Sequence, residues 1–377
     1  MSITIAVPKE TANGERRVAM VPSALKLIQK LGANVRMQHG AGVAAGFTDE
    51  QYEGVEWAKT SEDLYKGADI VLRVQPPTAE ESAKLPENII LAGYMTPHEG
   101  DSRIRNLVKR KVTSFSLELV PRITRAQSID ALSSQGNIAG YKCALLAAHL
   151  SPKLFPMLTT AAGTVKPARV VVVGAGVAGL QAIATARRLG AIVEAYDVRA
   201  ATREQVESLG GKFIDTGVSA EGEGGYAREL TDEEKAQQAE VLAKHIANAD
   251  AVITTAAIPG RPAPKIIDKA TVERMKAGSV IVDMAAETGG NCELTEAGKE
   301  VQHEGVLIAG PRNIPSMAAT HASEMYARNL CNLLALIVKE GSIDLNWDDE
   351  VVADSCLTHA GEIRHAPTRE RIEGGTK

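Results

Sequence analysis

Residues 168–197 read ARVVVVGAGVAGLQAIATARRLGAIVEAYD, and the fold can be worked out from this stretch outward. The valines at 170–173 form a short β-branched run, which is typical of a strand buried on both faces. The glycine turn GAGVAG follows at 174–179, and an alanine-rich segment to Leu189 predicts a helix. A second apolar run, AIVEAY, leads to Asp197. Strand, turn, helix and strand in this order predict a βαβ unit within a parallel α/β sheet.

The glycines and the acid have the spacing of a dinucleotide-binding motif. Gly174 would permit the tight turn, Gly176 would let a pyrophosphate approach the backbone, and Gly179 would let the helix pack closely on the strand. Asp197 would accept a hydrogen bond from an adenosine-ribose 2′-hydroxyl and repel a 2′-phosphate, which favours NAD(H) over NADP(H). Arg199 lies close enough to weaken that preference.

A glycine turn alone could simply begin a tightly packed helix, but the preceding strand and the following acid favour a cofactor site. The predicted cofactor-binding residues of this unit are Gly174, Gly176, Val177, Ala178, Gly179, Asp197, Val198, Arg199 and Ala257.

The composition bounds the class of protein. At 377 residues the chain is long enough for two domains of ordinary size. A hydrophobic content of 44% with 3% aromatic residues predicts cores of valine, isoleucine, leucine and alanine. The net charge of −5 gives no basic surface for nucleic acid. The four cysteines show neither a CxxC pair nor a metal-ligand spacing, so no metal site is expected.

No targeting or membrane segment is predicted. The amino-terminal sequence MSITIAVPKE lacks the basic and apolar regions of a signal peptide. The longest apolar windows, 143–150 and 329–338, are too short to span a bilayer. We therefore expect a cytoplasmic protein with no direct membrane insertion, which can still work beside a membrane partner.

Strands alternate with helical patterns in the first 120 residues as well. The predicted strands there are 3–7, 33–38, 68–75, 88–94 and 112–119. They indicate a second Rossmann-like unit, without the glycine motif. The expected fold class is α/β, with two Rossmann-like domains (doubly wound parallel sheets) separated by a cleft. Two long helices, at about 130–148 and 316–338, would join the domains. The predicted domains are 1–130 plus 325–377, which lacks the motif, and 131–324, which binds NAD(H).

Three further segments have distinct patterns. Residues 154–168 predict a hairpin, which is either a dimerisation arm or an ordinary surface turn. Residues 215–235 predict a long exposed loop, a lid or an insert, with Tyr226 near its tip. Residues 347–367 predict a strand and a turn.

The segment 121–137 concentrates polar groups just before a predicted helix. A solvated loop with a helix cap explains it about as well as a binding site does. Few of these groups titrate, so they suit holding an amide and ribose hydroxyls better than moving protons. The eight histidines, by contrast, lie in separate places and form no acid–base pattern. The polar residues are Arg122, Arg125, Gln127, Ser128, Asp130, Ser133, Ser134, Gln135 and Asn137.

These residues carry a resemblance to a known family. The stretches RITRAQSIDALSSQGNIAGY, GAGVAGLQAIATARRLGA and SVIVDMAAETGGNCELTE resemble the NAD(H)-binding component, domain I, of proton-translocating nicotinamide nucleotide transhydrogenases. The resemblance covers nearly the whole chain. In fused forms a membrane domain would follow where this chain stops, so the resemblance implies the split-subunit type, in which a separate chain forms the first portion of the alpha subunit.

The resemblance also implies roles and partners. It places four catalytic residues at the nicotinamide end of the site, with Gln127 and Ser133 also contacting the nucleotide, and it places Tyr226 on a mobile loop that closes over it. NADP(H) would be bound on a partner domain. Partner subunits would bind NADP(H) and span the membrane, and the chain would be a homodimer, peripheral to the inner membrane. The four implied catalytic residues are Arg122, Gln127, Asp130 and Ser133.

The alternative is an alanine dehydrogenase-like enzyme of the same superfamily. That enzyme's substrate-binding lysine lies in a KVKEP-like stretch, whereas this chain reads RVQPP and has Gln75 there. His98 is near, but out of register with, that enzyme's histidine, and Arg17 remains a possible carboxylate ligand. Hydride passage between two nucleotides moves no proton at the reacting carbons, so a site without an acid–base pair fits that reaction. A non-catalytic NAD(H) sensor is a third possibility.

Overall fold

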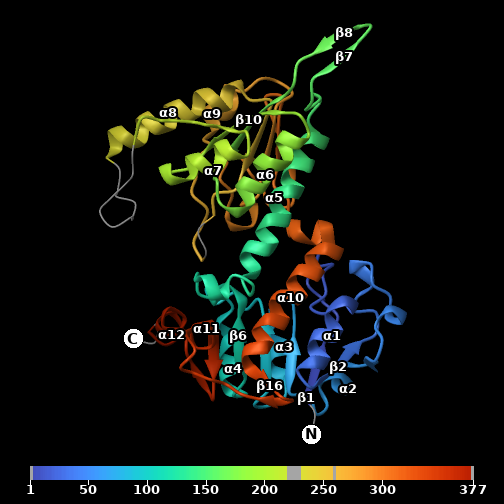
Figure 1. Cartoon of the computed structure of the whole chain (residues 1–377). Coiled ribbons are helices and arrows are strands. Elements are labelled where there is room, and N and C mark those ends of the chain that lie inside the picture. Colours follow the sequence, from blue (N-terminus) through green and yellow to red (C-terminus); the bar gives the residue numbers. More distant parts are fainter. Residues whose placement is uncertain (1–2, 219–230, 258–259, 375–377) are drawn as a thin grey trace. The chain divides into compact units, whose positions relative to one another are not determined.

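The computed structural model describes residues 3–218, 231–257 and 260–374, and the chain divides into two compact units (Figure 1). Unit 1 comprises residues 1–135 and 316–377, and unit 2 comprises 136–315. The predicted domain boundaries, 130/131 and 324/325, lie five and nine residues from these. Helix α5 (Ala131–Leu150) begins in unit 1 and continues in unit 2, whereas α10 (Ala319–Ile337) lies within unit 1.

Unit 1 contains an eight-stranded sheet in the order β19-β18-β6-β5-β4-β1-β2-β3. The six strands from β1 to β6 are parallel and run in the order 3-2-1-4-5-6, as in doubly wound folds, and β18 and β19 extend the sheet antiparallel. The strands are β1 (Ile3–Val7), β2 (Ala33–Gln38), β3 (Glu56–Ala58), β4 (Ile70–Leu72), β5 (Ile90–Gly93), β6 (Thr113–Ser116), β18 (Cys356–His359) and β19 (Glu362–Ile363).

Helices bury both faces of this sheet. Ile5 of β1 packs in a cluster with α1 and α10, while the next residue, Ala6, packs with α2 and α4 on the other face. Helix α10 places Ala322, Tyr326 and Leu330 in the core, at the four-residue spacing of one helix face. The remaining helices are α1 (Pro22–Lys30), α2 (Ser61–Tyr65), α3 (Ala79–Lys84), α4 (Asp101–Lys109), α11 (Glu350–Ser355) and α12 (Ala366–Glu373).

Unit 2 repeats the same plan with the order β11-β10-β9-β12-β13-β15-β14, in which only β14 runs antiparallel. The valine run forms β9, an interior strand between β10 and β12, and its alternate side chains enter two different clusters. The strands are β9 (Arg169–Val173), β10 (Ile192–Tyr196), β11 (Lys212–Phe213), β12 (Ala251–Thr254), β13 (Val280–Asp283), β14 (Glu300–His303) and β15 (Val306–Ala309).

Helices cover both faces of the second sheet too. Val170 and Val172 pack with α5 and α6, whereas Val171 and Val173 pack with α8 and α9. The helices after α5 are α6 (Val177–Arg188), α7 (Arg203–Ser208), α8 (Asp232–Asn248) and α9 (Lys269–Glu273). The predicted α/β class, with two Rossmann-like units, is confirmed.

Three local predictions have clear outcomes. The hairpin is confirmed as β7 (Leu158–Thr160) paired antiparallel with β8 (Gly163–Val165). The strand and turn predicted over 347–367 are present as β18 and its pairing with β19, but the prediction misses helix α11 before β18 and the start of helix α12 at Ala366. Over the described residues, no helix combines the length and apolarity that a membrane span requires.

Candidate functional site

The glycine turn of unit 2 lies at the carboxyl end of β9, where the strand order reverses. Strands β10 and β12 flank β9 on its two sides, so the connections that leave β9 and β12 go in opposite directions along the sheet. This is the topological switch point at which open α/β sheets bind ligands. The turn that begins at Gly174 and the loop that begins at Thr255 meet there, and the Thr255 hydroxyl donates to the carbonyl oxygen of Gly174 at 3.1 Å.

Two of the three glycines exclude any side chain. Gly174 has a φ of +97°, and a Cβ there would lie 2.7 Å from the Thr255 hydroxyl oxygen. A Cβ on Gly179 would lie 1.8 Å from the Gly174 carbonyl oxygen. The first turn of α6 therefore packs directly on the backbone of the strand that precedes it.

Gly176 differs because the space beside it is open. A Cβ there would have no heavy atom within 4 Å, and its backbone, with φ −77° and ψ −168°, is extended. Gly176 caps α6, and no side chain of the described residues accepts a hydrogen bond at that cap. The first N–H groups of α6, from Val177 to Gly179, have no acceptor within the helix and lie at the positive end of its dipole. An open approach and unpaired donors fit a pyrophosphate.

Asp197 lies beside this turn, at the end of β10. Its Oδ2 accepts a 2.7 Å bond from the Ala175 N–H, which ties it to the glycine turn. Its Oδ1 accepts the backbone N–H and the Nε of Arg199, both at 2.9 Å, and an Arg199 terminal nitrogen donates to Oδ2 at 3.0 Å. Burial raises the pKa of Asp197, but the hydrogen bonds from Arg199 and Ala175 and the arginine charge lower it more, so the net pKa lies below its usual range. The carboxylate is thus ionised at neutral pH.

The loop after β12 is held by two buried residues that the sequence reasoning does not single out. Asn291 accepts the Ala256 N–H at 3.1 Å and donates to the Ala256 and Pro264 carbonyls. Asp283, at the end of β13, accepts Thr254 Oγ1, the Ala285 and Cys292 N–H groups and Thr295 Oγ1. Ala257 is exposed on the loop that they fix, and Val198 is exposed after Asp197.

The predicted polar residues from Arg122 to Gln135 lie in unit 1, and Asn137 lies in unit 2. Arg122 and Gln127 have exposed side chains, and neither forms a side-chain hydrogen bond with the part of the chain that the structure describes. Asp130 precedes α5, and its carboxylate accepts the Ser133 N–H at 2.9 Å and the Ser133 hydroxyl at 2.5 Å. This is helix-capping geometry. Gln135 is buried and accepts a 2.9 Å bond from Arg17.

The equivalent switch point of unit 1, between β1 and β4, contains a buried polar cluster in place of a glycine turn. Arg17 forms a two-point ion pair with Glu15, with Nη2–Oε2 at 2.7 Å and Nε–Oε1 at 2.9 Å. Gln75 donates to the same Glu15 carboxylate at 2.7 Å. Glu10 accepts the N–H groups of Val74 and Gln75. The protein's own carboxylates thus occupy the ligand position of this fold.

Burial acts differently on these two carboxyls. Burial raises the pKa of Glu15, but hydrogen bonding and charge from Arg17 outweigh it and lower the pKa to about 2. For Glu10 burial dominates over the attraction of Arg73, and the pKa rises to about 7. The Arg73 terminal nitrogen lies 3.9 Å from Glu10, which is too far for a hydrogen bond. Glu15 is therefore the fixed anion of the cluster.

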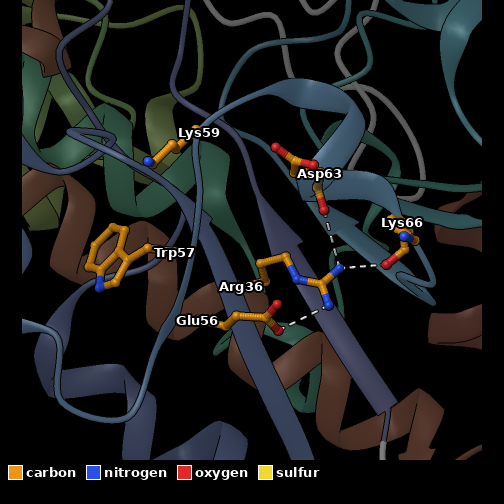
Figure 2. A pocket seen from close by; sticks show the side chains of 6 residues that line it. All are labelled: Arg36, Glu56, Trp57, Lys59, Asp63 and Lys66. Atoms are coloured by element: carbon orange, nitrogen blue, oxygen red, sulfur yellow. Dashed lines mark hydrogen bonds and ion pairs between the residues drawn. The ribbon is translucent and has the colours of Figure 1, made fainter.

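Two other features lie away from the predicted residues. A cavity of about 340 Å³ lies beside β2, β3 and α2, and Figure 2 shows the side chains that line it. Arg36 there donates to the carbonyl oxygen of Lys66 and pairs with Glu56. Arg36 thereby caps the end of α2. Among the described residues, Glu273, His303 and Glu304 bring three potential metal-ligand atoms within 4.8 Å of one another. The predicted residue Tyr226 lies outside the described residues.

Comparisons with known proteins find similarity over nearly the whole chain. The family models "Alanine dehydrogenase/PNT, N-terminal domain" and "Alanine dehydrogenase/PNT, C-terminal domain" match residues 6–139 and 143–366. The first portion of the NAD(P) transhydrogenase alpha subunit of Rhodospirillum rubrum, a separate chain, is 48% identical over 374 residues, covering 96% of this chain and 97% of that protein.

Two solved structures are similar over their whole length. A transhydrogenase from Sinorhizobium meliloti has a TM-score of 0.85 and 42% identity, covering 97% of this chain and 99% of that one. An L-alanine dehydrogenase has a TM-score of 0.82 at 24% identity, covering 99% of each chain, and shares the fold. The resemblance predicted from the sequence is therefore confirmed: the chain belongs to the alanine dehydrogenase/PNT family.

Proposed function

We propose that this chain is the NAD(H)-binding subunit of a proton-translocating nicotinamide nucleotide transhydrogenase, of the Re/Si-specific kind. When bound, NADH supplies a hydride that passes directly to NADP⁺ held on a partner domain, coupled to proton movement through a membrane partner. The observation that carries the proposal is the open, uncapped N-terminus of α6 beside Asp197, together with the 48% identity to a transhydrogenase subunit.

Residues of unit 2 bind the nucleotide in this proposal. The N–H groups of Val177, Ala178 and Gly179 would bind the pyrophosphate, and the missing side chain of Gly176 would leave room for it. Asp197 accepts the adenosine-ribose hydroxyls. Val198, Arg199 and Ala257 would line the rim of the site, and Tyr226, to which the resemblance assigns a role, lies outside the described residues.

Residues of unit 1 act at the nicotinamide end. Arg122 and Gln127 have exposed side chains. In this proposal Gln127 and Ser133 would hydrogen-bond the nicotinamide-side groups. Asp130 fixes the Ser133 hydroxyl through their 2.5 Å bond, and so acts as a positioning residue. These groups orient the nicotinamide and exclude water, which is what direct hydride transfer requires, since no general base is needed.

The charge of the unit 1 cluster argues against amino-acid dehydrogenation. A substrate carboxylate needs a cation, and in this chain Glu15 engages the Arg17 guanidinium at two points. The third group of the cluster, Gln75, is neutral and donates to Glu15. Glu15, Arg17 and Gln75 together carry no net positive charge, so an anionic amino-acid or oxo-acid substrate gains no electrostatic attraction there.

Partner subunits follow from the same proposal. They bind NADP(H) and span the membrane, and they hold this cytoplasmic chain at the periphery of the inner membrane. The name of the Rhodospirillum rubrum relative, which describes one portion of an alpha subunit, supports a divided assembly. The exposed apolar side chains of the β7–β8 hairpin, Met157, Leu158 and Val165, support a homodimer, because an isolated two-stranded hairpin is only marginally stable in water.

The chain alone is expected to bind NADH and to show no alanine-dependent reduction of NAD⁺. Binding is measured by the change in NADH fluorescence on titration, and turnover by absorbance at the nicotinamide band with alanine and NAD⁺ in excess. Alanine turnover by the purified chain, at a rate typical of dehydrogenases, would overturn the proposal in favour of the alanine dehydrogenase-like alternative.

A further inference from the structure

The carboxylate of Asp197 is fully engaged by groups of the protein itself. A carboxylate offers about four lone-pair sites. Four donors fill them: the N–H of Ala175, and the N–H, Nε and terminal nitrogen of Arg199, at 2.7 to 3.0 Å. An adenosine ribose that approaches Asp197 therefore meets a carboxylate with no acceptor site left.

Only the two donors of the Arg199 side chain can withdraw without altering the backbone. The Ala175 and Arg199 N–H groups belong to the turn, and the Arg199 carbonyl is itself held by the Thr202 N–H at 3.1 Å and the Thr202 hydroxyl at 2.8 Å. The Arg199 side chain, by contrast, is 57% exposed, whereas that of Asp197 is 7% exposed. The exposed Arg199 guanidinium can therefore exchange its bonds to Asp197 for bonds to water, whereas the buried Asp197 side chain stays in place.

We propose that the Arg199 guanidinium competes with the adenosine ribose for Asp197, so that NADH binds only when Arg199 releases the carboxylate. The inference rests on the proposed function, namely that NAD(H) binds at this turn. In this inference Arg199 lowers the affinity of the site for NADH and affects the choice between NADH and NADPH, and it does not itself hold NADH.

Release of Arg199 also bears on the choice between the two nucleotides. The paired Asp197 and Arg199 have no net charge, so the ribose edge of the site does not present an uncompensated anion to a 2′-phosphate. The released guanidinium, two residues from Asp197, is the type of group that accommodates a 2′-phosphate in NADP(H)-binding sites. Removing it leaves Asp197 as a bare anion, which attracts ribose hydroxyls and repels the 2′-phosphate. Both effects favour NADH.

The matched variants are Arg199→Ala and Arg203→Ala. Arg203 lies four residues further along and pairs with Asp215 in an exposed contact at 2.5 Å, so its removal deletes one arginine charge nearby and leaves Asp197 untouched. The backbone bonds from Thr202 do not involve the Arg199 side chain, so Arg199→Ala keeps the turn. The Asp197–Arg199 pair is partly exposed and of modest strength, so the expected change is about three- to tenfold.

The experiment is a fluorescence titration of the full chain with NADH and with NADPH, at low and at high salt. We expect Arg199→Ala to bind NADH about three- to tenfold more tightly than wild type at low salt, to raise the NADH-to-NADPH affinity ratio, and to differ less at high salt because salt screens the pair. Arg203→Ala should match wild type. Unchanged or weaker NADH binding by Arg199→Ala would overturn the competition. No NADH binding by wild type would overturn the proposed function, and this inference with it.

Discussion

Replacing Gly179 with alanine is expected to destabilise unit 2 by about 3 kcal/mol or more and to abolish NADH binding. The added Cβ would lie 1.8 Å from the Gly174 carbonyl oxygen, so the helix must move off the strand. Backbone atoms cannot rotate away as a flexible side chain can, and α6 packs on β9, an interior strand of the sheet. Moving α6 would therefore disturb both the hydrophobic core of unit 2 and the glycine turn at 174–179.

The matched control is Gly176→Ala. Its Cβ would have no heavy atom within 4 Å, and the extended backbone there accepts any residue. We expect this variant to keep wild-type stability within about 0.5 kcal/mol. Its methyl group would enter the space through which the pyrophosphate approaches, so NADH affinity should fall about tenfold or more, which corresponds to about 1.4 kcal/mol.

Hydrogen exchange separates the two variants. Both tryptophans of the chain, Trp57 and Trp347, lie in unit 1, so tryptophan fluorescence does not report on unit 2. Mass-spectrometric exchange of peptides from β9, β10 and β12 gives the stability of unit 2 directly. Wild-type protection in Gly179→Ala, or wild-type NADH binding in Gly176→Ala, would contradict the account of the turn.

Arg17→Met is expected to destabilise unit 1 by about 3–5 kcal/mol, because it leaves Glu15 as a buried charge without its ion-pair partner. Methionine is apolar and of comparable length, so the loss reflects charge more than cavity formation. Gln135 also loses the bond that it accepts from Arg17. Urea unfolding followed by tryptophan fluorescence measures the effect, since both tryptophans report on unit 1.

The double variant Arg17→Met with Glu15→Gln is the control, because it removes both charges. It should be clearly more stable than Arg17→Met alone. The pKa of Glu15 is lowered from 4.5 to about 2, so its contribution to wild-type stability is complete above about pH 4.5 and is lost as the pH falls towards 2. Between pH 4.5 and about 2, the free energy of unfolding of the double variant should therefore fall less than that of wild type. If the free energy of unfolding fell by the same amount in Arg17→Met and in the double variant, relative to wild type, Glu15 and Arg17 would not act as a pair.

Much of the fold follows from local patterns in the sequence. The valine run, the glycine turn and the apolar run before Asp197 predict β9, α6 and β10 because each pattern is set by neighbouring residues. Strand β14 (Glu300–His303) is not predicted, since it is a polar, partly exposed edge strand with no apolar run. Helix α11 is missed because its six residues are too few to show helical periodicity.

The candidate site is predictable only where it is contiguous. Gly174, Gly176, Gly179 and Asp197 lie within one βαβ unit, so their spacing identifies them. Contact partners that are distant in sequence have no such spacing, so the sequence does not identify them. Glu15 and Gln75 are 60 residues apart and Asn291 reaches back 35 residues to Ala256, and only the folded sheets bring them together.

Nor can a sequence show how a predicted residue is engaged. Asp130 caps α5 through Ser133, and Asp197 is already bound by Arg199. Position in the sequence predicts Asp197 as a ribose acceptor and Arg199 as a cofactor-binding residue that weakens the preference for NAD(H). The competition between the two depends on side-chain geometry, which follows from tertiary structure. One weak signal for the missed residues exists: Asp283 directly follows the apolar run Val280 to Val282.

The central claim is tested most directly by following the transferred hydrogen itself. NADH carrying deuterium at the transferred position is mixed with NADP⁺ and this chain, with and without the NADP(H)-binding partner domain, and the NADPH formed is examined by mass spectrometry. We predict deuterium in the NADPH only when the partner domain is present, with no hydrogen taken from water. Tight NADH binding without exchange, or NADPH that contains solvent hydrogen, would contradict direct hydride transfer from this subunit.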